Sequence, residues 1–311
     1  MLRSIDAEAV HRALPYPLLI QALRQAFAAP VTVPARHHHE VERPGRDPGV
    51  LLLMPAWQPG AATGVKLVHI CAGNEAESLP SVQGLYILFD GPTGTPLAVM
   101  DGTALTLRRT AATSALAADW LARADARRLL VIGAGALGPH LARAHAAIRP
   151  VDEIRIWNRT TGRAEEAARL LAAEGLPARA VADLDGSLSW ADIVSSATMS
   201  REPLVRGELL RPGAHVDLVG AFTPTMRESD DDAIRRAAVF VDAREGALSE
   251  AGDILLAIRS GAFTADRIRA DLFELARGEA CGRRSDDEIT LFKSVGNALE
   301  DLAAARLVVA A

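Results

Sequence analysis

The chain has 311 residues, of which 49% are hydrophobic and 23% charged, a composition typical of a globular protein rather than a disordered one. Its formal net charge of −5 argues against the basic surface that nucleic-acid binding requires. No apolar run approaches the roughly 18 residues that a membrane-spanning helix needs, so we expect no membrane association.

Two cysteines, Cys71 and Cys281, lie far apart in the chain and outside any zinc-binding spacing. We expect both to be free core residues, as is usual in a reducing compartment. The first residues contain no apolar segment of the secretory type. The sequence therefore predicts a cytoplasmic protein.

Residues 1–30 predict helix, interrupted by Pro15 and Pro17, because apolar residues recur there at helical spacing. Three adjacent histidines follow at 37–39 in a strand-like stretch. Neighbours in a strand point to opposite faces, so three in a row cannot bind one ion, and we expect no metal site.

Apolar runs at 50–55, 64–70, 83–90 and 96–101 predict strands, the last two joined by a hairpin turn. The first hundred residues thus form an α+β unit. Lys66 is a lone cation inside the second run. Burial would lower its pKa and suit it to proton transfer. The alternative is a lysine on an edge strand that points into water.

A long helix is predicted from Thr106 to about Ala122. Arg108, Arg109 and Thr110 lie near its expected start, where they could bind the carboxylate of a substrate or the phosphate of a cofactor. The alternative for the two arginines is ordinary helix surface.

A buried-type strand, 129–132, runs directly into a Gly-x-Gly-x-x-Gly turn, and a helix (137–148) and a second strand (153–157) follow. This context is typical of a dinucleotide-binding turn, in which the helix N-terminus faces the phosphates. The turn residues expected to contact the cofactor are Gly133, Gly135, Ala136, Leu137 and Gly138.

The tip of the second strand reads Asn158-Arg159-Thr160, with Arg163 shortly after, and carries no carboxylate. A site for NAD usually places Asp or Glu there to bind the ribose 2′-hydroxyl, whereas arginine can bind a 2′-phosphate. We therefore expect NADPH as cofactor, with NADH as the alternative. The alternative is a solvent-exposed helix start whose arginines bind no cofactor.

Further strand-like runs at 178–181, 193–197, 215–218 and 239–241 alternate with helical segments, which predicts a doubly wound parallel sheet. Ligands bind beyond the carboxyl ends of such strands, which adds Ala197 and Thr198 to the cofactor site. After Glu288, an apolar stripe from Phe292 and Val295 to Ala303 predicts one helix that returns to the first unit.

Several stretches occur in the order found in the ornithine cyclodeaminase/mu-crystallin family, which the chain resembles over nearly its whole length. They include Met54-Pro55, Gly64-Val65-Lys66, Arg109-Thr110-Ala111-Ala112-Thr113-Ser114, the glycine turn and Lys293-Ser294-Val295-Gly296. The resemblance implies a homodimer. It also implies a substrate-binding and dimerisation domain at 1–115 and 290–311, and a Rossmann domain at 116–289.

The resemblance also implies roles by position. Lys66 matches the active-site lysine of the family, and Arg36 and Arg109 match its substrate-carboxylate arginines. Thr110 matches a contact to the cofactor phosphates, and Met54 and Phe222 are expected beside the substrate.

One departure separates the activities found in the family. The cyclodeaminases carry Asp where this chain has Phe222, and a carboxylate is useful for the proton transfers of cyclodeamination. We therefore expect an NADPH-dependent reductase of a small cyclic imino acid such as Δ1-pyrroline-2-carboxylate. The alternatives are an ornithine cyclodeaminase that uses Glu228 or Asp217, a dehydrogenase of an open-chain amino acid, and a non-catalytic NADPH-binding protein like mu-crystallin.

Overall fold

The computed structural model describes residues 2–77 and 79–311. The chain divides into two compact units, one formed by Met1–Thr110 with Asn297–Ala311 and the other by Ala111–Gly296. Helix α3 (Gly102–Leu121) runs across the first boundary. Among the described residues, no helix is long and apolar enough to cross a membrane.

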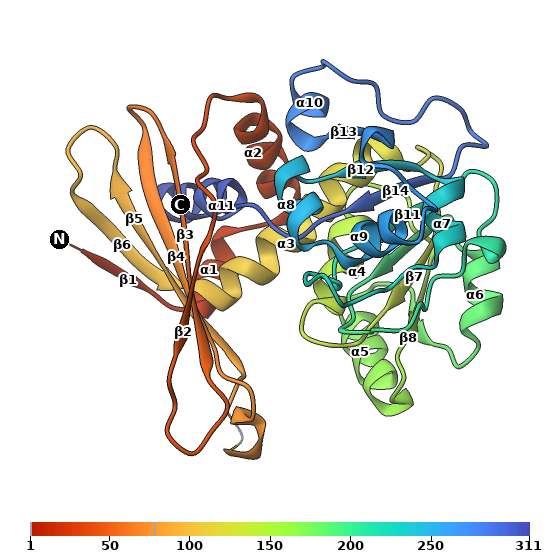
Figure 1. Ribbon diagram of the computed structural model, residues 1–311, viewed down its shortest axis with the longest axis horizontal. Coiled ribbons are helices and arrows are strands. Elements are labelled where there is room, and N and C mark those ends of the chain that lie inside the picture. Colours follow the sequence, from red (N-terminus) through yellow and green to blue (C-terminus); the bar gives the residue numbers. More distant parts are fainter. Residues whose placement is uncertain (1, 78) are drawn as a thin grey trace. The chain divides into compact units, whose positions relative to one another are not determined.

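The first unit contains a six-stranded sheet in the order β1-β6-β5-β4-β3-β2 (Figure 1). Every pair of neighbours is antiparallel except β1 and β6, which are parallel. The strands are β1 (Arg3–Ile5), β2 (His37–Val41), β3 (Gly49–Gln58), β4 (Ala62–Ile70), β5 (Val82–Asp90) and β6 (Pro96–Asp101).

Helices α1 (Ala7–Ala13), α2 (Tyr16–Ala28) and α11 (Ala298–Ala310) belong to the same unit. Helix α11 packs on α2 and on strands β3, β4 and β5, although it follows the whole second unit in the sequence. It begins with a capping box in which the Asn297 side chain and Glu300 satisfy each other's backbone N–H groups.

The second unit is built on an eight-stranded sheet in the order β13-β12-β14-β11-β10-β7-β8-β9, and every neighbouring pair is parallel. The strands are β7 (Arg128–Ile132), β8 (Glu153–Trp157), β9 (Ala178–Ala180), β10 (Ile193–Ser196), β11 (His215–Leu218), β12 (Ala238–Val241), β13 (Ile268–Asp271) and β14 (Thr290–Lys293). The helices are α4 (Gly138–Ala146), α5 (Thr161–Ala173), α6 (Leu184–Trp190), α7 (Asp231–Arg236), α8 (Arg244–Glu250), α9 (Gly252–Arg259) and α10 (Leu272–Ala276).

Successive residues of β7 enter two different cores, which explains its unbroken apolar sequence. Leu129 and Val131 belong to one cluster of buried residues, and Leu130 and Ile132 belong to another. A parallel sheet covered on both faces requires such strands. The run β9-β8-β7-β10-β11 is the strand order of a Rossmann fold, so the expected α/β class with a doubly wound parallel sheet is confirmed.

Several expected elements were wrong in place or type. Phe292 does not begin a helical stripe, because it lies in β14, which inserts between β11 and β12. Strands β1 and β13 were not expected at all. Neither cysteine is in the core, since Cys71 is half-buried and Cys281 is exposed.

Candidate functional site

In the second unit, the backbone of the glycine turn has the geometry expected for a dinucleotide. Gly133 adopts a φ of 105°, and a Cβ there would lie 2.6 Å from the carbonyl oxygen of Ala197. A Cβ on Gly138 would overlap the carbonyl oxygen of Gly133. Gly135 is exposed, and a Cβ added there would have no neighbouring atom within 4 Å, so the backbone is open to a ligand at that position. The residues therefore fit a bound pyrophosphate.

Asn158 ties the glycine turn to the tip of β8. Its Oδ1 accepts a hydrogen bond of 3.1 Å from the backbone N–H of Ala134, and its Nδ2 donates one of 3.0 Å to the carbonyl of Thr160. Thr160 is the N-cap of α5, but its side chain makes no capping hydrogen bond there. Arg159, Thr160 and Arg163 are all exposed at this tip, where they are accessible to a ligand.

The loops that follow β10 and β11 are held by one buried carboxylate, Glu228. Its Oε1 accepts hydrogen bonds from Ser196 Oγ (2.7 Å) and from both the backbone N–H (2.7 Å) and Oγ1 (2.8 Å) of Thr198. Its Oε2 accepts from the backbone N–H groups of Gly220 (2.6 Å) and Ala221 (3.3 Å). Ala197 and Thr198 are thus fixed beside Gly133 by a residue far along the chain.

Burial raises the pKa of Glu228, and the nearby Asp253 raises it further, whereas Lys293 lowers it. Lys293 is fully buried with its Nζ 3.4 Å from Asp253 Oδ2. Phe222, in contrast, stands in the loop after β11 with 41% of its surface exposed.

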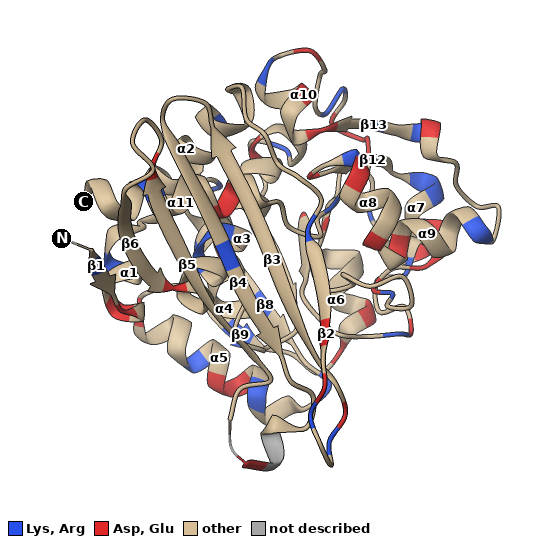
Figure 2. Ribbon diagram, turned by 60° about the vertical axis from the view of Figure 1, so that its left-hand side comes forward, with Lys and Arg blue, Asp and Glu red and all other residues tan. Residues whose placement is uncertain are grey.

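In the first unit, Lys66 lies on an interior strand and is only 3% exposed, so the interpretation as an edge lysine in water is wrong. It pairs across the sheet with Met54 on one side and Tyr86 on the other. All three side chains are buried on the same face. The sequences of β3, β4 and β5 contain one lysine or arginine, Lys66, and Figure 2 shows basic residues in blue on these strands.

Gly64, two residues before Lys66, makes room for the Tyr86 ring. A Cβ at Gly64 would overlap Tyr86 Oη and lie 2.6 Å from Cζ. The Tyr86 hydroxyl is buried without a hydrogen-bond partner among the described residues. Burial raises its pKa well above the ordinary value, and the charge of Asp301 adds to this effect.

Two cations and two carboxylates form a buried cluster, here called the α11 ion cluster: Lys66, Arg109, Glu300 and Asp301. Asp301 Oδ2 lies 2.8 Å from Lys66 Nζ, and its Oδ1 accepts a hydrogen bond of 3.0 Å from Arg109 Nε. Glu300 Oε2 accepts one of 2.5 Å from Arg109 Nη1. The structure thus brings Lys66 and Arg109 together through a shared carboxylate.

The cluster sets the protonation of both cations. Burial and the charge of Arg109 lower the pKa of Lys66, the carboxylates of Asp301 and Glu300 oppose them, and the result is about 8. Burial also disfavours the charged form of Arg109, but Asp301 and Glu300 outweigh it and raise the pKa of Arg109 above its ordinary value. An ammonium whose pKa is lowered in this way can release its proton at mildly alkaline pH.

Arg36 is half-buried and directly precedes β2, in which His37 pairs with Leu53. It therefore lies at the start of the strand that pairs with β3, the strand that carries Met54.

Helix α3 begins at Gly102, earlier than expected, so Arg108, Arg109 and Thr110 lie in its interior rather than at its N-terminus. The argument that they bind anions through the start of the helix was therefore wrong. Arg108 instead donates to the ring and carbonyl of His11 and lies over the Tyr16 ring. Thr110 is half-buried in the middle of the helix.

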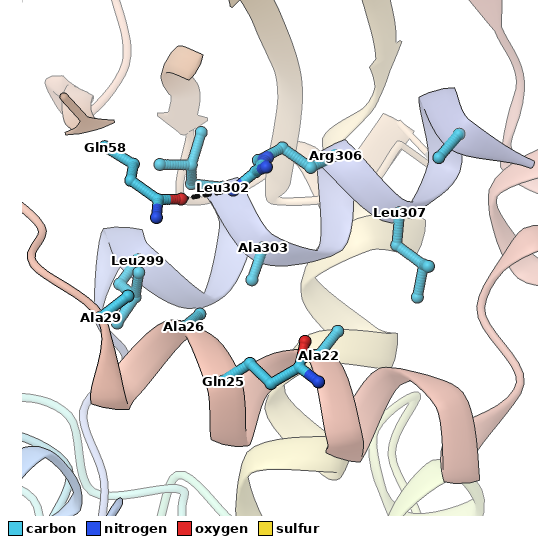
Figure 3. A pocket seen from close by; sticks show the side chains of 11 residues that line it. Ala22, Gln25, Ala26, Ala29, Gln58, Leu299, Leu302, Ala303, Arg306 and Leu307 are labelled. Carbon is cyan, nitrogen blue, oxygen red and sulfur yellow. Dashed lines mark hydrogen bonds between the residues drawn. The ribbon is translucent and has the colours of Figure 1, made fainter. Parts of the chain in front are cut away.

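Two other features carry no comparable chemistry. The histidines at 37–39 are exposed on edge strand β2, and the described residues contain no group of three or more metal-ligating side chains. A groove of about 460 Å³ between α2 and α11 is lined mostly by Ala and Leu, and its Arg306 is hydrogen-bonded to Gln58 (Figure 3).

Comparison with known proteins agrees with this architecture. The family model described as "Ornithine cyclodeaminase/mu-crystallin family" matches residues 5–310. The chain belongs to this family. It is 42% identical to the Δ1-pyrroline-2-carboxylate reductase of Paracoccus denitrificans, over 91% of this chain and 88% of that protein.

Two solved structures of the family have the same fold over nearly the whole chain. One is the Δ1-pyrroline-2-carboxylate reductase of Thermococcus litoralis in complex with NADH and L-proline, with a TM-score of 0.93, 32% identity, and coverage of 100% of this chain and 97% of that one. The other is an archaeal alanine dehydrogenase dimer with bound NAD, with a TM-score of 0.91, 29% identity, and coverage of 99% and 95%.

The two acids of α11 were not predicted from the sequence. Apart from Arg306, Glu300 and Asp301 are the polar residues of a helix that is otherwise apolar, and a buried acidic pair requires cationic partners. The scarcity of lysine could also have drawn attention to these sites. Of 34 basic residues only Lys66 and Lys293 are lysines, and in the structure both are buried beside an aspartate.

Proposed function

We propose that this protein is an NAD(P)H-dependent reductase of a small cyclic imino acid such as Δ1-pyrroline-2-carboxylate, with proline as product. The observation that carries the proposal is the buried Lys66, which is poised to give up a proton and is linked through one carboxylate to Arg109. The similarity to reductases of this substrate supports it.

The proposed reaction adds one hydride and one proton across the C=N bond. When bound, the reduced nicotinamide supplies the hydride to the imine carbon. Lys66 donates the proton to the ring nitrogen and becomes a neutral amine, which is reprotonated from solvent. An ammonium has three N–H donors, and Asp301 and Thr106 occupy at most two of them, which leaves one for the substrate.

We propose that Arg36 and Arg109 bind the carboxylate of the substrate, with Met54 beside it. A guanidinium can bind a carboxylate through two parallel hydrogen bonds, which suits both arginines to this role. Arg109 also lies close to Lys66, since both contact Asp301.

The second unit would hold the cofactor through the glycine turn, Asn158, Thr198 and the backbone near Ala197, and Thr110 is proposed as a further contact. The exposed Arg159, Thr160 and Arg163, without a carboxylate at the strand tip, favour NADPH over NADH. A guanidinium attracts the 2′-phosphate that an aspartate would repel.

The cyclodeaminase alternative finds less support, because the acids it would use are already engaged. Glu228 accepts hydrogen bonds from five donors, and Asp217 accepts from Ser195 Oγ at 2.5 Å and lies near His145. Both carboxylates are fully buried. Phe222, where the cyclodeaminases have Asp, cannot transfer a proton.

We also propose that the protein is a homodimer and that the sheet of the first unit forms the interface. The face of this sheet opposite Lys66 presents apolar side chains at Leu53, Val65, Leu67, Leu85 and Ile87, and none of them is buried. Leu85 is 50% exposed. A continuous apolar sheet face of this kind is typical of a partner-binding surface.

The decisive experiment measures oxidation of NADPH and NADH with Δ1-pyrroline-2-carboxylate, in parallel with ammonia release from ornithine. We expect rapid oxidation of NADPH, slower oxidation of NADH, and no ammonia. Ammonia release with only catalytic amounts of NAD would identify a cyclodeaminase instead. No turnover in either assay would refute the reductase.

A further inference from the structure

Helix α11 brings two carboxylates from the end of the chain into the proposed substrate site. Glu300 and Asp301 are both fully buried, in the first turn of a helix whose other buried residues are apolar. Burying two carboxylates is costly unless each is paired with a cation. Here the partners are the two residues proposed to handle the substrate.

The two acids make different contacts. Glu300 contacts Arg109 through Oε2, and its Oε1 accepts from the Asn297 backbone N–H in the capping box. Asp301 alone contacts both cations, with Oδ1 on Arg109 and Oδ2 on Lys66. Losing Asp301 would therefore release Lys66 and loosen Arg109 together.

A lysine at position 66, rather than an arginine, is suited to proton transfer. The chain uses arginine at 32 of its 34 basic positions. Arginine remains charged in proteins, whereas a buried lysine changes its pKa readily and can lose its proton. An ammonium beside Asp301 thus suits a site where a proton must be both retained and released.

We propose that Asp301 is a positioning residue of the reductase: it orients the Lys66 ammonium toward the imine nitrogen, keeps it protonated, and fixes Arg109 for the carboxylate of the substrate. The proposal rests on the function proposed above. Glu300 serves Arg109 and the start of the helix, and so provides a matched comparison.

Among the described residues, the charged and titratable groups around Lys66 are Asp301 and Glu300 from α11, Arg109 from α3 and Tyr86 from β5, and Thr106 of α3 also contacts its ammonium. Arg109 disfavours the charged lysine, and both acids favour it. Replacing Asp301 by a neutral residue leaves Arg109 as the dominant charged neighbour, so we expect the Lys66 pKa to be lower than in the wild type.

The test compares D301N with E300Q. In D301N we expect the Lys66 titration to move down by about 1 pH unit or more, as removal of an adjacent opposite charge does. The falling limb of the rate profile should move with it, and KM for the imino acid should rise. In E300Q the titration should move less, because Glu300 does not contact Lys66.

The titration can be read without any turnover. Protein labelled with ¹³C at lysine Cε gives only two side-chain signals, because the chain contains only Lys66 and Lys293, and K293R assigns them. If the wild-type enzyme reduces no imino acid, the proposed function fails, while the signals still report whether Asp301 controls Lys66.

A Lys66 titration and a KM that stay unchanged in D301N would overturn the proposal. If D301N does not fold, D301E decides, since it keeps the charge but displaces it by one methylene. We then expect the Lys66 titration to be retained and kcat to fall about tenfold, because proton transfer depends on geometry. Unchanged kcat and KM in D301E would overturn the proposal equally.

Discussion

Replacement of Lys66 by methionine removes the proposed proton donor while keeping most of the side-chain volume. General acid catalysis by a positioned side chain contributes about 10²–10⁴-fold in rate. That range corresponds to about 3–5 kcal/mol of transition-state stabilisation. Because Lys66 is only 3% exposed, water has little access to replace it as the donor, so we expect a loss within this range.

The same substitution leaves Asp301 Oδ2 without its cation. Removing one partner of a buried ion pair costs about 3–5 kcal/mol in stability. Asp301 retains its contact with Arg109, so we expect the lower end of this range. Thermal unfolding of K66M measures this loss and verifies that the variant is folded under the assay conditions.

The assay is the pH dependence of kcat/KM for imino acid reduction, which reports groups of the free enzyme. In the wild type, kcat/KM should be constant below about pH 8 and fall at higher pH, because the lowered pKa of Lys66 lets it lose its proton there. K66M should lack this decline, and K66R, which stays charged, should lack it too. Wild-type kcat in folded K66M, or an unchanged decline near pH 8, would refute the assigned role.

The remaining predictions concern the cofactor turn and the interface. R159D should shift the ratio of kcat/KM for NADPH to that for NADH by about 10–100-fold toward NADH, the factor that loss of one hydrogen bond to a charged group gives; an unchanged ratio would show that Arg159 does not bind the 2′-phosphate. G133A should lower stability by about 1–3 kcal/mol and weaken NADPH binding in calorimetry, since Gly133 has a positive φ and its Cβ would meet Ala197; wild-type values for both would contradict the turn geometry. We expect the wild type to be the proposed dimer in light scattering and L85K to be a monomer of 33.0 kDa; an L85K variant that remains dimeric would exclude this face as the interface.

The Rossmann unit could be predicted from the sequence because the residues that identify it lie close together in the chain. The run 129–132, the three glycines and the next strand lie within one supersecondary unit. There is no room for a Cβ at Gly133 or Gly138, and Gly135 leaves the backbone open to a ligand. The wrong assignment of Phe292 has the opposite cause. A buried strand of four residues has no period of its own, so its apolar residues continued the pattern of the helix that follows.

In the first unit, the sequence predicted some residues of the site but not the contacts between them. The isolated cation in an apolar strand identified Lys66, but its environment depends on Asp301, which lies near the other end of the chain. Only the fold shows that α11 covers the face of β4 that carries Lys66. The family resemblance supplied Arg36 and Arg109, whereas the acids that hold Arg109 required the structure.

The most direct test of the reductase is isotope transfer from NADPH deuterated at the reactive position of C4, with Δ1-pyrroline-2-carboxylate as acceptor. Mass spectrometry should find one deuterium at the α-carbon of proline and one NADPH oxidised for each proline formed. Proline without deuterium, or product formed without net oxidation of NADPH, would contradict hydride transfer to the imine carbon.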